Sequence, residues 1–561
     1  MSSTRLLILG MDAAEPELLR QWTADGTLPN LAALGRRGRT AGIRGVAGFH
    51  IGSTWPSLYT GTTPARHGFH YQIQHCPGTY RYHRPQDHGL IHGTPFWRAL
   101  SDANRRVAML DVPLSPLDSS LNGMQIQEWG GHDALYGFHA HPASVAEQIR
   151  ARFGDHPVGA GCDGERCTAA DHAAFVDRLV RGVELKAEMT REFLREGAWD
   201  AFMQVFSETH CVGHQCWHLH DPSHPAHDAE LAAAVGDPVR RVYQSVDSAI
   251  GRILEEAGDC TVFVFSAHGM GYWYGADFLL PEILSRLGVS RPLAAAGRSA
   301  DGAGARRRSM LTAGAAWGWH RLPLPVRERL RGIRSRYGPK APAKGPPTLP
   351  PVDLSESRCF HQPNGLATGG IRLNLAGREP QGTLQPGPEA DAFMRELTQD
   401  LLDIVDARTG QPFIQRVIRV DEHYQGPRLP DLPDLVVEYS DATPTGSMRV
   451  GNGAGARVRV HSPRVGVVEG ANEYGRTGEH RSRGMLFAAG PGVAAGESEA
   501  TVSILDLAPT WTRLLGVDLE TTEGTPIDGI MPDSSPVRRA RPDFTDGCEG
   551  DPPGATQGRR S

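Results

Sequence analysis

The fold is decided by residues 201–218, AFMQVFSETHCVGHQCWH, in which an apolar strand pattern runs into three histidines at four-residue steps. Enzymes of the α/β class place metal ligands at the carboxyl ends of such strands. If a helix begins after Glu208, His210 and His214 lie one turn apart on one face and can share a metal ion. The alternative is a histidine-rich helix face that binds nothing. His218 lies a further turn from the strand, and we interpret it as structural.

Four other segments repeat the strand pattern, and each ends at a polar or glycine-rich turn. They are residues 5–10, 106–111, 261–265 and 484–488, with long helical patterns at 174–194 and 239–256. Apolar strands that alternate with amphipathic helices predict an α/β fold, with a mostly parallel central sheet flanked by helices on both faces. Residues 429–439 and 503–517 extend this pattern, so we expect one large domain over residues 1–531.

Composition and charge limit the classes of protein. The chain has 561 residues, 39% of them hydrophobic and 22% charged, which is ordinary for a soluble globular protein. Apolar runs are too short for a transmembrane segment or a signal peptide, which predicts a cytoplasmic protein. The net charge of −6 argues against a nucleic-acid partner.

The eight cysteines are sparse for this length. Cys162 with Cys167, and Cys211 with Cys216, match no common zinc-finger or redox spacing. We therefore interpret the cysteines as reduced thiols that mainly pack in the core.

A basic insertion is expected at residues 291–350. From residue 291 to residue 344, thirteen Lys and Arg stand against only Asp301 and Glu328. Residues 325–337 predict a short basic helix with Val326, Leu330 and Ile333 on one side. The insertion is a solvated loop, a lid over an anionic substrate or a contact for an acidic lipid surface. Residues 532–561 lack periodicity and predict a disordered tail.

Four more polar side chains stand at the ends of predicted elements. Asp12 follows the first strand, where a carboxylate can hold a cation or cap a helix. Thr54 precedes Trp55-Pro56-Ser57, a helix start that places its hydroxyl at a helix N-terminus, as a cap or as a phosphate contact. As a nucleophile it needs a base or a metal. His268 follows a strand and precedes Gly269, and His480 stands just before the last strand.

Several ordered segments of the chain resemble the alkaline phosphatase superfamily, and more closely its type I phosphodiesterase / nucleotide pyrophosphatase branch. They include GMDAAEP (10–16), STWPSLYTGTTPARHG (53–68), SETHCVGH (207–214), SAHGMG (266–271) and TGEHRSRG (477–484). The resemblance covers roughly residues 5–530. It implies an alkaline phosphatase-like fold with insertions.

The resemblance also implies two divalent metals, usually zinc and in some branches manganese, held against a Thr or Ser nucleophile. Asp12 and His268 would bind the metal that activates Thr54, itself a ligand. His214 and His480 would bind the other metal, with His210 where the family usually has Asp. A second Asp of the family, the partner of His268, is replaced here by Ala267.

These two departures remove two negative charges from the expected site. The second metal is then held more weakly, or one metal suffices, or Glu208 serves as a substitute ligand. Imidazole-rich ligation favours zinc, iron, nickel or copper over magnesium, so we expect zinc, with manganese or iron as alternatives. Because the segment from Thr54 to Gly61 is about one turn shorter than in related enzymes, Ser53 is the alternative nucleophile.

The sequence thus predicts a metal-dependent hydrolase of small-molecule phosphate esters. The leading hypothesis is a phosphodiesterase or nucleotide pyrophosphatase type of enzyme with a covalent phospho-threonine at Thr54. The alternatives are a phosphomonoesterase or phosphonate hydrolase of the same superfamily, and a catalytically lapsed homologue that only binds metal.

Overall fold

A ten-stranded mixed sheet forms the centre of the protein. The computed structural model describes residues 5–84, 91–159, 161–293, 322–337, 352–497 and 501–530. The strand order is β20-β2-β19-β9-β1-β8-β5-β6-β7, with β21 beside β2. The inner strands run parallel: β9 (Thr261–Ser266), β1 (Leu6–Met11), β8 (Ala201–Phe206), β5 (Val107–Leu110) and β6 (Gly123–Gln127).

The outer strands make the sheet mixed. Strand β19 (Arg483–Ala489) is antiparallel to both β9 and β2 (Arg39–Arg44), and β7 (His139–His141) is antiparallel to β6. Two short strands, β20 (Gly496–Glu497) and β21 (Val502–Ser503), pair in parallel with β2. All five predicted strands are present in this sheet, each within one residue of its expected bounds, and the predicted fold class is confirmed.

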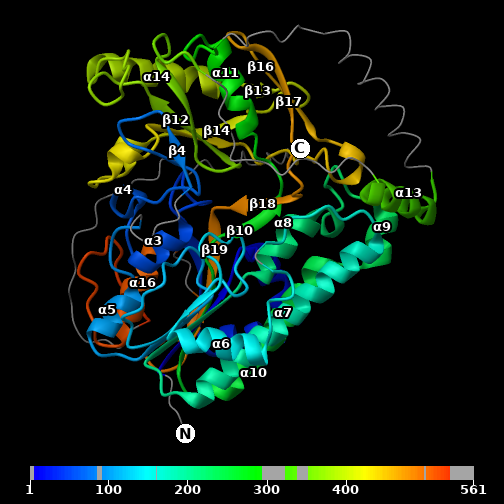
Figure 1. Ribbon diagram of the computed structural model, residues 1–561, viewed down its shortest axis with the longest axis vertical. Helices are drawn as coiled ribbons and strands as arrows, with labels where there is room; N and C mark the ends of the chain where they lie inside the picture. Colours follow the sequence, from blue (N-terminus) through cyan, green and yellow to red (C-terminus); the bar gives the residue numbers. More distant parts are fainter. Residues whose placement is uncertain are drawn as a thin grey trace, which may run out of the picture.

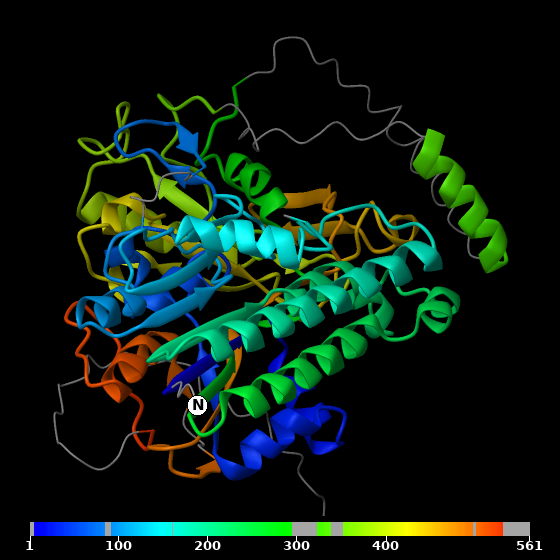
Figure 2. The ribbon, with the colours of Figure 1, turned by 60° about the horizontal axis from the view of Figure 1, so that its bottom comes forward.

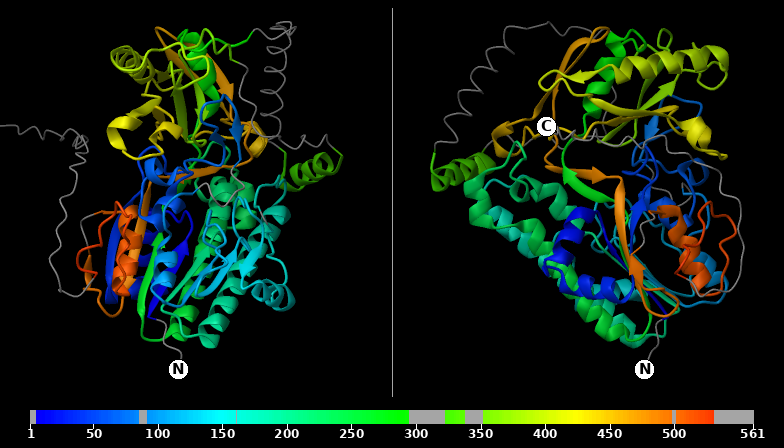
Figure 3. Two further views of the ribbon diagram at one scale, coloured as in Figure 1. Left: turned by 60° about the vertical axis from the view of Figure 1, so that its left-hand side comes forward. Right: turned by 180° about the vertical axis from the view of Figure 1, so that it is seen from behind.

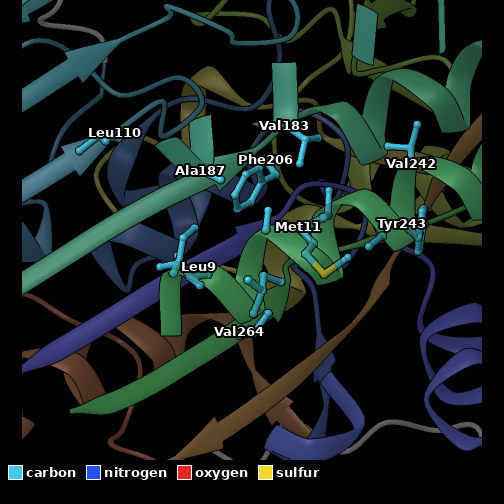
Figure 4. Close-up of a cluster of buried hydrophobic side chains, with 14 of the residues drawn as sticks. Leu9, Met11, Leu110, Val183, Ala187, Phe206, Val242, Tyr243 and Val264 are labelled. Atoms are coloured by element: carbon cyan, nitrogen blue, oxygen red, sulfur yellow. The ribbon is translucent and has the colours of Figure 1, made fainter. Parts of the chain in front are cut away.

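One face of the sheet is covered by long helices (Figures 1 and 2). They are α7 (Ala169–Glu196), α8 (Glu208–His220) and α10 (Pro238–Ala257), and they contain both predicted helical patterns. Figure 4 shows Leu9, Met11, Phe206 and Val264 of the strands near Val183 and Ala187 of α7 and Val242 and Tyr243 of α10. Leu7, Leu9 and Met11 face this core, whereas Leu6 and Ile8 face the opposite one, as the two-residue period of a strand requires.

The opposite face is covered by α3 (Thr54–Thr60), α5 (Phe96–Asp102) and α16 (Leu507–Leu514), which enclose a second apolar core. The prediction that helices flank both faces is therefore confirmed. Further helices of the described chain include α1 (Pro16–Ala24), α2 (Pro29–Arg37), α4 (Pro64–His67), α6 (Ala143–Arg152), α9 (Ala229–Val235) and α15 (Val420–His423).

A second group of elements lies above the central sheet in Figures 1 and 3. An antiparallel sheet has the order β11 (Cys359–Pro363), β12 (Thr368–Leu373), β15 (Leu435–Tyr439), β14 (Ile414–Arg419). It shares an apolar core with α11 (Leu280–Arg286), α14 (Pro388–Leu402) and the sheet of β13 (Val405–Asp406), β16 (Arg457–Ser462) and β17 (Gly466–Ala471). Of the predicted segment 429–439, residues 435–439 thus belong to a separate sheet, because an apolar strand pattern does not specify which sheet the strand joins. The single domain over residues 1–531 stays a prediction.

Two short ladders complete the described strands. Strands β10 (Gly269–Tyr272) and β18 (Gly478–Arg481) pair antiparallel between the central sheet and the upper group, and β3 (Gln74–His75) pairs with β4 (Tyr82–His83). Among the described helices, none combines the length and the apolar character needed to cross a bilayer.

The predicted basic helix is present as α13 (Leu324–Tyr337), beside α9 in Figure 1. Its Arg327 is buried and pairs with Asp228 and Glu230, whereas the three predicted apolar residues are 43–50% exposed. The other residues of the 291–350 insertion, apart from 291–293 and 322–323, and the tail at 532–561 lie outside the described residues.

Candidate metal centre

Five of the predicted metal ligands converge at the carboxyl edge of the central sheet. Asp12 follows β1, His268 follows β9, and His210 and His214 lie in the first two turns of α8, which follows β8. Carboxyl ends of parallel strands share one edge of a sheet. His480 reaches this edge on β18, where it pairs with Met270, and the chain then enters β19.

The imidazole rings lie within contact of one another. His210 Nε2 is 2.6 Å from His480 Nε2 and 3.1 Å from His214 Nε2. Ligand atoms of His210, His268 and His480 all lie within 4.8 Å of one another. The Asp12 carboxylate lies 3.8 Å from His210 Nδ1 and 3.9 Å from His268 Nε2. The structure therefore brings one carboxylate and four imidazoles to one buried point.

The hydrogen bonding of these rings fits a cation. His214 Nδ1 lies 2.8 Å from the Gly478 carbonyl, to which it donates, so the lone pair of Nε2 faces the cluster. Both ring nitrogens of His268 and the Nδ1 atoms of His210 and His480 are buried without a partner among the described residues. Buried polar atoms rarely stay unpaired, and neutral imidazole nitrogens are good ligands for zinc and similar ions.

Burial sets the charge state of the cluster. Desolvation lowers the pKa of His268 to about 3 and holds the pKa values of His210, His214 and His480 well below the ordinary value. The imidazoles are therefore neutral at neutral pH, which is the form that binds metal.

Asp12 is held from two sides. Its Oδ1 accepts a hydrogen bond of 3.1 Å from Trp55 Nε1, and its carbonyl accepts one of 2.6 Å from the Thr209 hydroxyl. Burial raises the pKa of Asp12 to about 6, opposed by the positive charge of His132 and the Trp55 hydrogen bond. The carboxylate is therefore mostly ionised at pH 7.

Thr54 begins α3, as predicted, and is buried beside the centre. Its Oγ1 donates to the His50 carbonyl at 2.6 Å, and Ser53 Oγ donates to the Phe49 carbonyl at 2.8 Å. The first turn of α3 borders the cluster, because Trp55 donates a hydrogen bond to Asp12 and the nearby His50 contributes to the lowered pKa of His268. The choice between Thr54 and Ser53 as nucleophile stays a prediction.

A neighbouring hydroxyl–imidazole pair has the wrong tautomer for catalysis. Ser57 Oγ lies 2.9 Å from His67 Nε2, and His67 Nδ1 accepts a hydrogen bond from the backbone N–H of Phe69 at 3.1 Å. Because Nδ1 is an acceptor, Nε2 of the neutral ring carries the proton and donates to Ser57. His67 therefore cannot act as the base for this hydroxyl in its observed arrangement.

Glu208 has partners other than the expected metal. Its carboxylate lies 2.9 Å from His156 Nε2 and 3.4 Å from Lys186 Nζ, and Lys186 Nζ lies 3.4 Å from Asp111. Burial opposes the charged ammonium, but Glu208 and Asp111 outweigh it and raise the pKa of Lys186. Glu208 thus neutralises a buried cation instead of completing the histidine cluster.

The buried Lys186 network also fixes a loop that sequence reasoning missed. Asp111 accepts hydrogen bonds from the backbone N–H groups of Trp129 and Gly130 at 2.8 and 3.0 Å. This loop follows β6 and carries His132, whose ring centroid lies 3.9 Å from that of His210. A histidine after a strand end was the available signal, but β6 itself was not recognised as a strand.

Glu479 is a second missed candidate ligand. Its carboxylate and the ring nitrogens of His214 and His480 lie within 4.8 Å of one another, and burial raises its pKa to about 7. His218, by contrast, contacts the Thr477 hydroxyl at 3.1 Å and belongs to none of the ligand groups found among the described residues. Its interpretation as structural is consistent with this contact.

Comparison with known proteins places this chain in a class of enzymes, the hydrolases of phosphoric esters. Residues 6–279, which include five of the six predicted site residues, match the model of the type I phosphodiesterase / nucleotide pyrophosphatase family. The resemblance to this family that was seen in the motifs is confirmed over these residues.

Solved structures include distant likenesses. Phosphonoacetate hydrolase from Sinorhizobium meliloti 1021, in complex with phosphonoformate, has 15% identity and a TM-score of 0.45, over 92% of this chain and 96% of that one. An inactive murine ectonucleotide pyrophosphatase / phosphodiesterase 5, in complex with AMP, has 11% identity and a TM-score of 0.44, over 93% and 98% of the two chains. No curated protein matches the chain by sequence.

Proposed function

We propose that this protein is a metal-dependent hydrolase of phosphate esters, of the phosphodiesterase or nucleotide pyrophosphatase type, that forms a covalent phospho-threonine at Thr54. The observation that carries the proposal is the convergence of Asp12, His210, His214, His268 and His480. Both ring nitrogens of His268 and one each of His210 and His480 are buried without a partner among the described residues. The match of residues 6–279 to the type I phosphodiesterase / nucleotide pyrophosphatase family model supports the reaction class.

We assign the ligands to two metal ions. Asp12 and His268 would hold the cation nearer to Thr54, and His210, His214 and His480 would hold a second one. Bound divalent cations would lower the pKa of an attacking hydroxyl or water and neutralise charge on the phosphoryl group. Imidazole-rich ligation suits zinc, with manganese or iron as alternatives.

Thr54 has to change its hydrogen bond to react. Its Oγ1 leaves the His50 carbonyl and forms a bond to phosphorus while the bond to the leaving oxygen breaks. The hydroxyl proton ends on the leaving alcohol. Water then cleaves the Thr54–phosphoryl bond and restores the hydroxyl, with the second proton released to solvent.

The Arg476 guanidinium lies beside the cluster and is balanced by two carboxylates. Its Nη1 lies 3.5 Å from His214 Nε2, and its other guanidinium nitrogens pair with Asp133 and Asp163.

Parallel assays of the zinc- and manganese-loaded protein test the proposal. Bis-p-nitrophenyl phosphate, p-nitrophenyl phosphate and a phosphonate are compared before and after chelation, with Thr54→Ala and Ser53→Ala as paired variants. We expect metal-dependent cleavage that prefers the diester, lost in Thr54→Ala and kept in Ser53→Ala. Full activity of Thr54→Ala would remove the nucleophile assignment, and metal-independent cleavage would remove the proposal.

A further inference from the structure

A second donor set of different chemistry borders the histidine cluster. His132 Nδ1 lies 3.1 Å from Cys162 Sγ and 3.3 Å from Cys211 Sγ, and the three atoms lie within 4.8 Å of one another. All three side chains are buried, and neither thiol is in a disulfide. We propose that His132, Cys162 and Cys211 form a zinc site of their own, beside the histidine cluster.

The orientation of His132 is that of a metal ligand. Its Nε2 lies 3.1 Å from the Asp133 carboxylate, which is itself held by Arg476 Nη2 at 3.1 Å. A carboxylate at Nε2 keeps the proton there, so zinc would displace the Nδ1 proton, and the lone pair left on Nδ1 would face the two sulfur atoms. Zinc-binding histidines commonly have such a carboxylate or carbonyl partner on the other nitrogen.

Separate parts of the fold hold the two thiols in place. Cys211 lies in the first turn of α8, where its backbone N–H donates to the Ser207 carbonyl at 3.0 Å. Cys162 lies in the segment before α7, and its carbonyl accepts a hydrogen bond of 2.7 Å from Arg166 Nη2. The same guanidinium binds Gln215 of α8 at 2.6 Å. The segment that carries Cys162 is therefore tied to the helix that carries Cys211.

The distances are close to those of a zinc site. Zinc binds sulfur at about 2.3 Å and imidazole nitrogen at about 2.0 Å, which separates tetrahedral N and S ligands by roughly 3.5 Å. The observed N–S separations of 3.1 and 3.3 Å need only a small expansion to admit the ion. Two thiolates make the set softer than the adjacent imidazole cluster and favour zinc over manganese or magnesium.

The site would join three segments around the histidine cluster. A zinc ion here would crosslink the loop after β6, the segment before α7 and the start of α8, which also carries His210 and His214. Three protein ligands leave a fourth coordination position open. The site does not depend on the proposed hydrolase function, because its donors are distinct from Asp12, His268 and Thr54.

Cobalt substitution of the chelated full-length protein tests the site directly, because thiolate-bound cobalt has a charge-transfer absorption that imidazole-bound cobalt lacks. We expect this absorption in the wild type and its loss in Cys162→Ser and in Cys211→Ser, with zinc content lower by about one equivalent per chain. The matched control is Cys216→Ser, a buried thiol on the same helix whose Sγ lies 4.0 Å from His172 Nδ1. This control should keep the absorption.

Failure of this site and failure of the hydrolase proposal give different results. His268→Ala should lose phosphate ester hydrolysis and keep the charge-transfer absorption. The zinc-site proposal is overturned if the wild type lacks the absorption, if both serine variants keep it, or if intact mass shows a Cys162–Cys211 disulfide in the purified protein.

A measurement on the wild type covers the case in which the serine variants do not fold. Alkylation of the chelated protein by iodoacetamide is followed by peptide mapping, with and without added zinc. Zinc should slow labelling of Cys162 and Cys211 by at least about tenfold and leave that of Cys216 unchanged. Equal labelling of Cys162 and Cys211 with and without zinc contradicts the site.

Discussion

His210 Nε2 and His480 Nε2 lie 2.6 Å apart although 270 residues separate them in the chain. One ring comes from the first turn of α8 and the other from β18, so the contact closes the histidine cluster across two elements. Two neutral imidazoles in such contact can share one proton in an N–H···N hydrogen bond, whereas a bound cation would accept the lone pairs of both nitrogens and move them apart.

Removing His480 should weaken zinc binding at the histidine cluster. In His480→Ala we expect zinc affinity to fall by more than about 100-fold, beyond the loss typical of partners outside the ligand set, and hydrolysis to fall with it. Calorimetric zinc titration of the chelated protein measures the affinity. The control is His220→Gln, a half-buried residue of α8 that pairs with Asp237 2.9 Å away. Equal losses in both variants would point to a general disturbance of α8.

Zinc binding should weaken as the pH falls below about 6. The pKa of Asp12 is about 6 in the metal-free fold, whereas that of His268 is about 3, so Asp12 takes up a proton before His268 does as the pH falls. Below this pH, affinity should fall by up to about tenfold per pH unit. Asp12→Asn should remove this dependence and leave the contribution of Glu479, whose pKa is about 7. An unchanged pH profile in Asp12→Asn would contradict the assignment.

The raised pKa of Asp12 also affects the stability of the metal-free protein. The pKa of Asp12 rises from 3.8 to about 6 on folding, so the fold binds the proton more tightly than the unfolded chain does. This contribution to stability is fully present below 3.8 and is lost as the pH rises through 6. In denaturant unfolding of the chelated proteins, the free energy of unfolding of the wild type should therefore fall relative to that of Asp12→Asn as the pH rises from 3.8 through 6. A rise of the wild type relative to Asp12→Asn over this range would contradict the raised pKa.

Trp55→Phe isolates the hydrogen bond to Asp12. The substitution keeps an aromatic ring and removes the Nε1 donor 3.1 Å from Asp12 Oδ1, so we expect zinc affinity to fall by about tenfold. Trp511→Phe is the matched control, because Trp511 lies in the same apolar core and its Nε1 has no partner among the described residues. Zinc titration of both variants makes the comparison, and equal affinities would remove the role given to Trp55.

Lys186→Met should strongly destabilise the protein. It leaves Asp111 and Glu208 buried without their cation, at an expected cost of about 3–5 kcal/mol in the free energy of unfolding. Arg98→Met, which breaks surface pairs with Asp102 and Asp118, should cost no more than about 1 kcal/mol. Denaturant unfolding measures both, and a near-neutral Lys186→Met would show that the carboxylates are protonated or hydrated.

Four of the five inner strands were predictable because strands covered on both faces are continuous apolar runs. Asp12, His210, His214 and His268, which follow those strands in the sequence, lie at one edge of the sheet for the same reason, and their role as metal ligands stays a prediction. Strand β6, GMQIQ, was missed because it contains two glutamines. Both side chains are buried, and their NH2 groups donate to the carbonyls of Pro116 and Ser115 at 2.9 and 2.8 Å. A single sequence does not show that such partners exist.

The thiol pair was missed for a different reason. Spacing rules compare neighbouring cysteines, such as Cys162 with Cys167 or Cys211 with Cys216. The structure pairs Cys162 with Cys211 through His132, across three elements. Only tertiary packing brings these residues together, so no local pattern encodes the contact.

The most direct test of the central claim follows zinc occupancy and diester hydrolysis in one titration of the chelated protein. We predict that cleavage of bis-p-nitrophenyl phosphate rises in proportion to zinc bound at the histidine cluster. The double variant His210→Ala with His480→Ala should neither bind zinc there nor cleave the diester. Full cleavage by the chelated wild type or by the double variant would contradict the account.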